Sequence, residues 1–493
     1  MITIHYNKLR TFTLCLLLLP AVIFLLTWVK IYLALPAVAL LGLALNPSIK
    51  IEDKTIKFKA SQLVVIGVVI AIWLFLSGMG GFFTQKLDLL YRNAIYRDLI
   101  NFSWPVRYQT QADESLVYYI GHWLFPALIG KLVKAIAGFN AGWLAARLAL
   151  FIYTFIFIYT SILLILFRIN KTTWKAIGVV VSIFVLFSGM DFIGELLTGG
   201  TSFHLDLWAT YFQYSSMATQ LNWVFNQAVP AWLACSLMLN EKDEKSFALI
   251  GLSLLPTSPL PLVGLAAYML VKALASLVKS SKAGKGKETL ANIFSRTNIL
   301  SAVALVPFFY AYYSENVASD NSLNLFVDWG ETDIGLYFFF YVLFILLEVV
   351  IIPLLIYKDK DKLELTFVVL TLLIFPFIRL GQGMDFCMRA SIPSLFILMV
   401  LVMEYILDAL DKPWCELEVI NKIKLIALII CLMIGVLTPV DEYKSSINHF
   451  IETDGACVKE CDYYETLIDL PLDRSNFVGE DASNSIFFGT LAR

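Results

Sequence analysis

The sequence predicts an all-α, polytopic transmembrane protein with about 13 membrane-crossing helices, and three observations lead to that prediction. Hydrophobic residues make up 59% of the 493 residues and charged residues only 15%, whereas an ordinary soluble domain has about 25% charge. Apolar runs such as 61–79, 143–167 and 336–356 approach the roughly 20 residues that a helix needs to cross about 30 Å of hydrocarbon. Lys and Arg residues gather in every second loop between these runs, as they do in loops that stay in the cytoplasm.

The apolar runs are expected to be helices because hydrocarbon leaves backbone groups unsatisfied unless they bond within the segment. Strands of a membrane barrel would be half as long and would alternate in polarity. The first run is expected to be retained, since no small-residue cleavage pattern follows it. The predicted crossings, in chain order, are 11–29, 31–45, 61–79, 143–167, 176–190, 224–240, 246–255, 260–278, 299–313, 336–356, 365–378, 392–410 and 425–440.

The distribution of basic residues predicts the orientation of the chain. With the N-terminus in the cytoplasm, the loops at 50–59, 168–175 and 279–296 lie inside and hold clusters of Lys and Arg. The loops at 191–223 and 314–335, which would lie outside, hold neither residue. The C-terminus is then extracytoplasmic.

One segment, 118–139, is apolar enough to cross, yet a crossing there would place the basic cluster at 168–175 outside. It is therefore expected to be an interfacial helix, within a large outer loop at 80–142. The expected organisation is a transmembrane domain at 1–440, which includes this loop, and a small extracytoplasmic tail at 441–493.

Charge and metal-ligand spacing exclude some classes of function. A net charge of −2 provides no basic surface for nucleic acid. No His, Cys, Asp and Glu cluster has metal-ligand spacing, so no metal and no other cofactor is expected. Cys457 and Cys461 lie in the polar tail, and whether they form a disulfide stays open.

The start of the outer loop, residues 84–105, is predicted to be an amphipathic helix in the interface. Asp88 and Arg92 are four residues apart and therefore share a face of that helix. Two interpretations stay open: an ion-paired surface helix, or a carboxylate acting as general base beside arginines that bind an anionic group. Further polar side chains follow at Asn93, Arg97 and Asp98.

A second candidate region, 379–393, lies between two crossings on the outer side. Arg389 and Gln382 provide donors near the start of a helix, which suits a phosphate or another anion. The alternative is that Arg389 pairs with Asp385 and caps the helix. A third region, 201–227, offers aromatic and amide side chains around His204, as either a sugar cleft or an ordinary membrane interface would.

Two glutamates, Glu348 and Glu404, fall inside predicted crossings. An ionisable residue at that depth is a candidate functional residue, although buried hydrogen bonds would explain both. Arg147, at the outer end of its helix, fits a phosphate contact or a snorkelling anchor.

The order of these features resembles the GT-C superfamily, polytopic glycosyltransferases that take sugar from polyprenyl-phosphate donors. In that superfamily an acidic residue follows an early crossing, as Asp88 follows Met79 here. An interface helix with an aromatic-rich, Pro-containing start comes next, matched by 118–128, and then a crossing opened by Ala-Arg-Leu, matched by 146–148. Shorter strings at 97–100, 104–106 and 385–393 are similar to those of bacterial multi-spanning proteins described as glycosyltransferases.

The resemblance implies a GT-C-like fold in a bacterial inner membrane and transfer of a sugar from a polyprenyl-phosphate donor to a glycan, lipid or protein acceptor on the extracytoplasmic side. Asp88 would deprotonate the acceptor, and Arg389, with Arg92 or Arg147, would counter the leaving phosphate. Family members often carry a paired acidic motif, whereas Leu89 and Leu90 follow Asp88 here. Asp98, ten residues further on, would have to act as the partner or be a bystander, and a divalent metal between the two carboxylates stays open.

Three other functions remain as alternatives. They are a transporter or flippase for lipid-linked sugars, a polymerase or ligase of lipid-linked saccharides, and a catalytically inactive structural subunit. The scarcity of ionisable groups within the predicted crossings argues against transport, and the missing second acid in the first loop keeps the structural subunit open.

Overall fold

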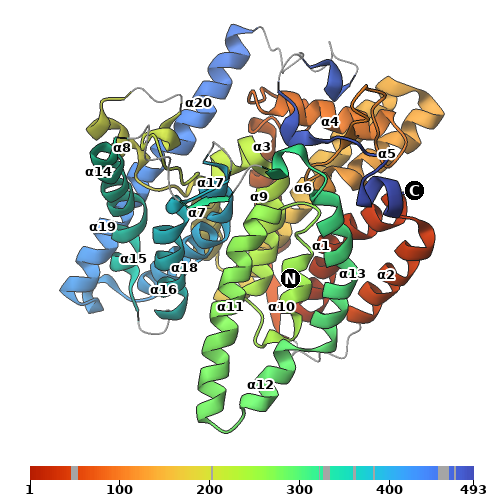
Figure 1. The fold of residues 1–493 in the computed structure, drawn as a ribbon. Coiled ribbons are helices and arrows are strands. Elements are labelled where there is room, and N and C mark those ends of the chain that lie inside the picture. Colours follow the sequence, from red (N-terminus) through yellow and green to blue (C-terminus); the bar gives the residue numbers. More distant parts are fainter. Residues whose placement is uncertain are drawn as a thin grey trace.

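The computed structural model describes residues 1–45, 54–200, 204–320, 323–325, 333–358, 362–380, 384–453, 466–470 and 473–493. In these ranges the chain is almost entirely helical (Figure 1). The helices are α1 Tyr6–Trp28, α2 Ile31–Ala44, α3 Ala60–Leu76, α4 Leu89–Asn101, α5 Gly121–Ala137, α6 Phe139–Ile169, α7 Trp174–Leu186, α8 Asp191–Thr198, α9 Met217–Met238, α10 Phe247–Leu252, α11 Pro259–Lys282, α12 Gly286–Ile293, α13 Arg296–Tyr313, α14 Ile334–Ile345, α15 Ile351–Ile356, α16 Lys362–Ile374, α17 Asp385–Ala390, α18 Ile392–Leu410, α19 Val419–Gly435 and α20 Leu437–Glu452.

Strands are short and occur in antiparallel pairs. β1 Ile2–His5 pairs with β2 Thr55–Phe58, and the other pairs are β3 Ser115–Leu116 with β6 Val478–Gly479 and β4 Leu323–Leu325 with β5 Ile378–Leu380.

Eight helical segments of the described chain are long and apolar enough to cross a membrane. The chain is therefore an all-α, polytopic membrane protein by the length and composition of its helices. These segments are Tyr6–Trp28, Phe139–Ile169, Trp174–Thr198, Pro259–Lys282, Gly286–Tyr313, Ile334–Ile356, Asp385–Leu410 and Val419–Glu452. The helices α2 and α3 are apolar but shorter.

The predicted crossing at 246–255 is not a membrane-length helix. Its helical part, α10, has 6 residues and covers only about 9 Å at 1.5 Å per residue. Turns occupy 253–257, where Ser253, Pro256 and Thr257 interrupt the apolar pattern. A count of apolar residues cannot detect this, because the pattern continues through the turns.

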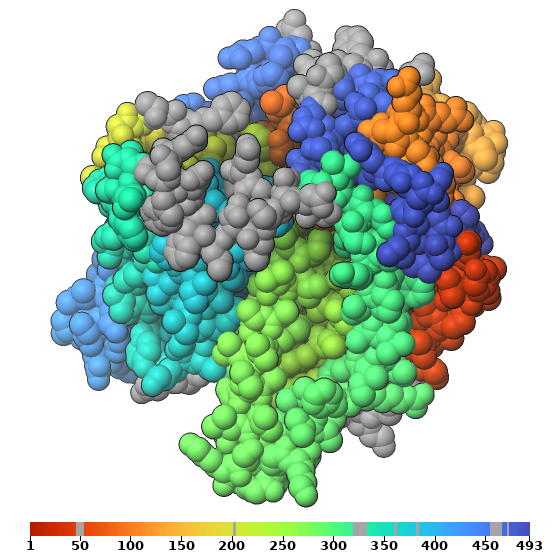
Figure 2. All heavy atoms as spheres, in the orientation of Figure 1, coloured from red at the N-terminus to blue at the C-terminus, as the bar shows by residue number. Residues whose placement is uncertain are grey.

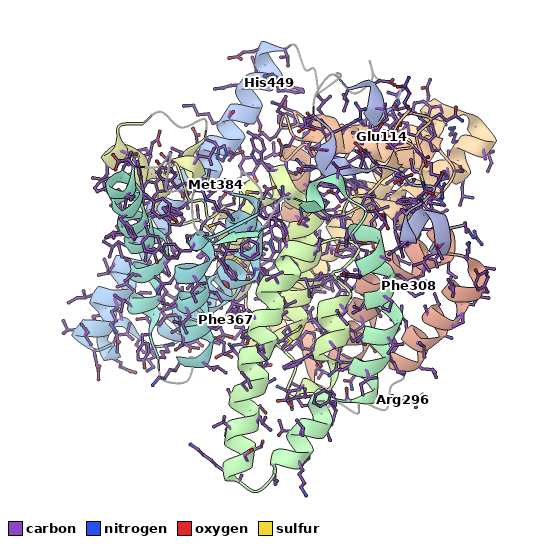
Figure 3. All side chains as sticks on the ribbon, viewed as in Figure 1. Glu114, Arg296, Phe308, Phe367, Met384 and His449 are labelled. Carbon is purple, nitrogen blue, oxygen red and sulfur yellow. The ribbon has the colours of Figure 1, made fainter. Side chains whose placement is uncertain are left out.

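The two ends of the molecule differ in the residues that they carry. Figure 1 places α4, α5 and α20 at one end, called the outer end below, and α12 at the opposite, inner end. Glu114 and His449 lie at the outer end and Arg296 toward the inner end (Figure 3). The inner hairpin of α11 and α12 projects beyond the rest of the surface (Figure 2), and it carries the predicted cytoplasmic cluster Lys279, Lys282, Lys285 and Lys287.

The helix termini follow local chemistry. Ser216, the N-cap residue of α9, accepts a hydrogen bond from the Thr219 N–H, with 3.0 Å between N and Oγ, which satisfies a donor that has no partner within the helix. Pro259 stands in the first turn of α11, where its missing N–H is not needed. α9 is kinked at Val224, whose φ of −136° is not helical. The axis of the helix therefore changes direction at this residue.

α9 and α18 form the centre of the bundle, where almost every side chain is buried. Trp232 of α9 stacks on Trp73 of α3 with ring centroids 6.0 Å apart. Small residues allow close approach elsewhere: a methyl group added at Gly264 of α11 would lie 2.1 Å from the carbonyl oxygen of Ala390. Such close backbone contacts are typical of helix packing in membranes, and this one fixes α17 against α11.

Buried and half-buried ion pairs connect the helices at the inner end. Arg10 of α1 donates from Nε to Glu241 at 2.7 Å and from Nη2 to the other carboxylate oxygen at 2.9 Å. Arg168 of α6 donates to Glu404 of α18 at 2.8 Å. Both pairs join residues more than 200 positions apart, so they fix the order of helices at this end.

The C-terminal segment packs on the outer loop. β6 pairs with β3, Arg474 donates to Glu114 at 3.0 Å, and the Lys30 N–H donates to the Leu491 carbonyl at 2.9 Å. The predicted domain boundary at 440 falls inside α20. Three segments of the predicted tail, the part of α20 after 440, 466–470 and 473–493, are thus part of the same packed structure as the helices.

Candidate functional site

The candidate site is built around Asp88 at the outer end. Asp88 immediately precedes α4, its side chain is 52% exposed, and its Oδ2 lies 3.4 Å from Nη2 of Arg92. The pair that the i, i+4 spacing predicts is therefore present. The charge of Asp88 also acts on Arg389 and His204, which are distant in sequence. Asp88 is thus a half-exposed carboxylate with cationic neighbours from two helices.

Two buried guanidinium groups have N–H donors left over: Arg92, which pairs with Asp88, and Arg389, on which the charge of Asp88 acts. Arg92 is 4% exposed, and its Nη1 has no hydrogen-bond partner among the described residues. Arg389 is 7% exposed, and its Nε is likewise without a partner in the described part of the chain. A buried N–H without an acceptor costs free energy, so both groups are poised to bind an anion. The guanidinium fork suits phosphate or carboxylate.

Arg389 is positioned by α17 and by the start of the segment that leads into α5. Asp385, one turn earlier in α17, lies 3.1 Å from Arg389 Nη2, so the predicted capping pair also forms. Tyr119 is hydrogen-bonded to the same guanidinium, and the pKa of its hydroxyl is raised to about 12, mainly by burial. At neutral pH this hydroxyl keeps its proton and can itself donate to a ligand.

A second set of polar groups continues from Asp88 toward the bundle. Lys86 lies 3.0 Å from the Glu442 carboxylate of α20, and Asn222 of α9 donates to the same oxygen at 3.3 Å. The His204 ring stacks on Trp223 with centroids 5.5 Å apart, and burial lowers the pKa of His204. A neutral imidazole and an indole side by side provide a flat apolar wall next to charged groups.

Three predicted residues have structural roles away from Asp88. Asn93 donates to the side-chain oxygen of Gln85 at 2.6 Å. Arg97 stacks on the ring of Phe139 at 5.0 Å. Arg147 donates to the carbonyls of Gly80 and Gly81 and lies 4.7 Å from the Phe82 ring. These contacts fix the outer loop.

Asp98, the predicted second acid, is fully buried and faces the C-terminal segment. Its Oδ2 accepts hydrogen bonds from the Tyr108 hydroxyl at 2.7 Å and from the Leu467 N–H at 2.9 Å. Burial raises the pKa of Asp98 to about 7. Among the described residues, no group of three or more His, Cys, Asp or Glu side chains is arranged to hold a metal ion.

Other predicted features lie outside the described residues. Gln382, which was expected to provide an anion-binding donor together with Arg389, belongs to the undescribed segment 381–383, and Cys457 and Cys461 belong to 454–465.

The sequence alone did not single out several site residues. Tyr119 lies within the matched segment 118–128 and Lys86 within the predicted helix 84–105, but nothing local indicates that they face Arg389 and Glu442. Asp191 and Asp206 lay in the outer loop after the fifth crossing, and the structure brings both close to Glu348. The only feature of the sequence that could have indicated Asp191 and Asp206 is that they are acidic residues in a loop that holds no Lys or Arg.

Comparisons of the chain with protein-family models, with curated proteins and with solved structures find no match. The function is therefore argued from the site alone.

Proposed function

We propose that the protein is a membrane glycosyltransferase of GT-C type that moves a sugar from a polyprenyl-phosphate donor to an acceptor on the extracytoplasmic side. One observation supports this most: the half-exposed carboxylate of Asp88 pairs with the buried Arg92, and its charge acts on the buried Arg389. Each of these arginines has an N–H group without a partner among the described residues, which can receive an anion. A transfer from a phosphate-linked sugar needs both a base and a site for the phosphate.

In this reaction Asp88 accepts the proton of an acceptor hydroxyl while the hydroxyl oxygen attacks the anomeric carbon. The bond between that carbon and the phosphate oxygen breaks, and polyprenyl phosphate leaves with the electron pair. Arg389 and Arg92 bind the phosphate as its charge grows, and Tyr119 can donate a further hydrogen bond. The Asp88 side chain is exposed enough to pass its proton to water afterwards.

The proposal extends to topology and location. We propose about 13 crossings, of which the one at 246–255 passes as the short α10 and turns rather than as one membrane-length helix. A cytoplasmic N-terminus, an extracytoplasmic C-terminus and a bacterial inner membrane fit the basic inner hairpin and the position of α4 and α20 at the opposite end (Figure 1). A lipid-linked donor would reach the site from the surrounding bilayer.

The test is release of polyprenyl phosphate from labelled polyprenyl-phosphate sugars by the purified protein. Asp88→Asn and Arg389→Ala should each abolish turnover. Arg296→Ala and Asp411→Asn, which remove exposed charges at the inner end, should leave it unchanged. Turnover that survives both site substitutions, or the absence of turnover with every donor despite donor binding, would refute the assignment.

Transport of lipid-linked saccharides remains the second candidate because of one observation. Asp191 and Asp206 join Glu348 in the interior, so the bundle contains more ionisable groups than the predicted crossings suggested. Donor flipping without phosphate release, measured in proteoliposomes, would favour this candidate.

A further inference from the structure

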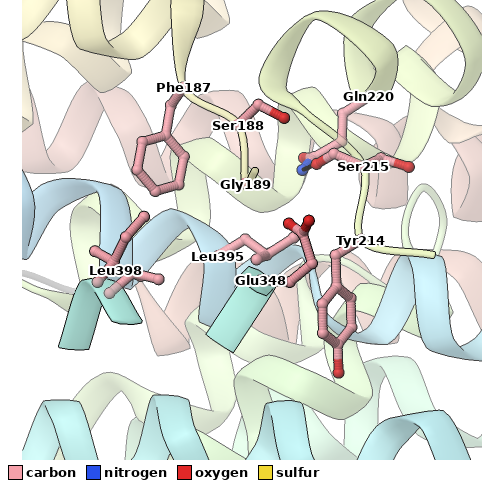
Figure 4. Close-up of a pocket in the computed structure, with 10 residues that line it drawn as sticks. Phe187, Ser188, Gly189, Tyr214, Ser215, Gln220, Glu348, Leu395 and Leu398 are labelled. Carbon is pink, nitrogen blue, oxygen red and sulfur yellow. Dashed lines mark hydrogen bonds between the residues drawn. The ribbon is translucent and has the colours of Figure 1, made fainter. Parts of the chain in front are cut away.

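Glu348 is a buried glutamate between α14 and α15, and the backbone around it is shaped to accommodate its carboxyl group. Glu348 lies in a five-residue π-helical turn, Leu346–Val350, between the two helices. Such turns insert a residue into a helix and are frequent at functional sites. Opposite it, a methyl group added at Gly189 would come within 1.3 Å of Glu348 Oε2. Only glycine there leaves room for the carboxyl group, which points toward Gly189 in Figure 4.

The neighbour of Glu348 is another carboxyl group. Asp191 of α8 uses Oδ2 to accept hydrogen bonds from the Ser188 hydroxyl at 2.6 Å and from the Thr438 hydroxyl of α20 at 2.8 Å. Its Oδ1 and Glu348 Oε1 have no donor among the described residues. The two carboxyl groups are within hydrogen-bonding reach of each other.

A hydrogen bond between two carboxyl groups requires a proton, because ionised carboxylates only accept. Both groups are almost completely buried, with 1% exposure for Asp191 and 3% for Glu348. Ionising both of these adjacent buried carboxyl groups would cost much free energy, because the two negative charges repel each other away from water. One proton shared between them removes one charge and supplies the missing donor.

The charged and titratable groups that face the pair add negative charge. Asp206, from the turn after α8, lies close to both Asp191 and Glu348, and the Thr219 hydroxyl and the Ser216 N–H face its carboxyl group. Glu442 of α20 faces Asp206 and is paired with Lys86. Tyr214 faces Glu348 as well, and the Trp208 N–H points toward Glu348 without a full hydrogen bond.

A proton explains this arrangement better than a metal ion does. No three acidic, His or Cys side chains of the described chain converge on one point as metal ligands. The cavity beside Glu348, lined also by Ser188, Ser215 and Gln220, has a volume of about 10 Å³, which is room for about one water molecule. A water there could relay a proton to Glu348.

The geometry points to an intramembrane proton-binding site in which Glu348 and Asp191 share one proton. The site is separate from the Asp88 site and does not depend on the proposed glycosyltransferase activity. Loss of the proton would place two adjacent carboxylates beside Asp206, and the repulsion would act on α8, on the π-helical turn and, through Thr438, on α20. The proton therefore links the packing of these three elements.

The test is infrared difference spectroscopy of the purified protein at pH 8, above the pKa of Asp98. Wild type minus Glu348→Gln should show one carboxylic-acid C=O band that shifts in D2O. Asp191→Asn should remove the same band, because its amide can donate to Glu348 and stabilise the carboxylate form. Wild type minus Glu404→Gln is the matched control and should show carboxylate bands only, since Arg168 pairs with Glu404.

Size-exclusion elution and the melting temperature establish that each variant is folded. If only one of Glu348→Gln and Asp191→Asn folds, that variant decides the question, because the shared proton requires both groups. A carboxylate band in place of the C=O band, or an unchanged C=O band in the folded variant, would overturn the shared proton.

Discussion

The carboxylate of Asp98 in α4 accepts a hydrogen bond from the backbone N–H of Leu467, 369 residues further along the chain. The Tyr108 hydroxyl donates to the same oxygen at 2.7 Å. Asp98 therefore connects the first outer loop with the C-terminal segment. Its burial and its partners describe a structural contact, whereas Asp88, ten residues earlier, keeps an exposed oxygen and cationic neighbours. Asp98 is thus a structural residue of the first loop, whereas Asp88 is the candidate site residue.

Replacement of Asp98 by Asn should remove a pH dependence of stability. Burial raises the pKa of Asp98 to about 7, above the value near 3.9 of an unfolded Asp. Its stabilising contribution is fully present below about pH 4 and is lost as the pH rises through 7. The loss is on the order of 4 kcal/mol at most, at about 1.4 kcal/mol per pKa unit.

Asn can accept both hydrogen bonds with its Oδ1 and does not ionise. The melting temperature of Asp98→Asn relative to wild type should therefore increase between pH 5 and pH 8. The measurement is thermal unfolding in detergent at several pH values. A constant difference at every pH would show that Asp98 is not protonated in the folded protein.

Gly264→Ala should disturb the candidate site from outside it. The new methyl group would lie 2.1 Å from the backbone carbonyl of Ala390, so α17 must move, and Arg389 with it. Overpacking of this kind costs about 1–3 kcal/mol. We expect a lower melting temperature and weaker binding of inorganic phosphate or donor.

The matched control is Gly178→Ala in α7, where nothing lies within 4 Å of the added methyl group. Ala in a helix interior is favoured over Gly by about 0.5–1 kcal/mol, so this variant should be as stable as wild type or slightly more so. Equal effects of the two substitutions would contradict the close contact between α11 and α17.

Glu241→Gln should destabilise the inner end strongly. Glu241 is the buried partner of Arg10, with both oxygens engaged at 2.7 and 2.9 Å. Removing one member of such a pair leaves a buried charge and costs about 3–5 kcal/mol. By contrast, Asp411→Asn breaks the half-exposed pair of Asp411 with Lys171, which is worth about 0–1 kcal/mol. The measurement is the melting temperature of both variants. Similar decreases for Glu241→Gln and Asp411→Asn would mean that burial of the ion pair does not determine the stability lost when it is broken.

Local spacing predicted the parts of the site that lie within one helix. Asp88 with Arg92 and Asp385 with Arg389 are both i, i+4 pairs, and both form, because positions four apart on a helix are neighbours. Apolar length likewise predicted α1, α6, α11, α13 and α18. It failed at 246–255, where turn residues stop the helix.

Contacts between distant segments could not be read from the sequence. Arg389 meets Tyr119, and Glu348 meets Asp191, across more than 150 residues in each case. Such pairs depend on which helices pack side by side, and hydropathy is the same for many packing orders. Glu348 could be suspected because a charge at that depth is costly, but its partner could not be named.

The opposite positions of the inner hairpin and α20 predict the outcome of a labelling experiment on membrane topology. Arg296 and His449 are both exposed and lie toward opposite ends of the molecule (Figure 3). Arg296→Cys and His449→Cys, each in a variant without native cysteines, should react differently with a membrane-impermeant maleimide. The basic cluster before Arg296 favours a cytoplasmic position for the hairpin, so we expect intact cells to be labelled only at position 449. Permeabilised cells should be labelled at both positions, which controls for reactivity. Labelling of both in intact cells, or of neither, would place the two ends on one side of the membrane and would remove Asp88 from the extracytoplasmic face.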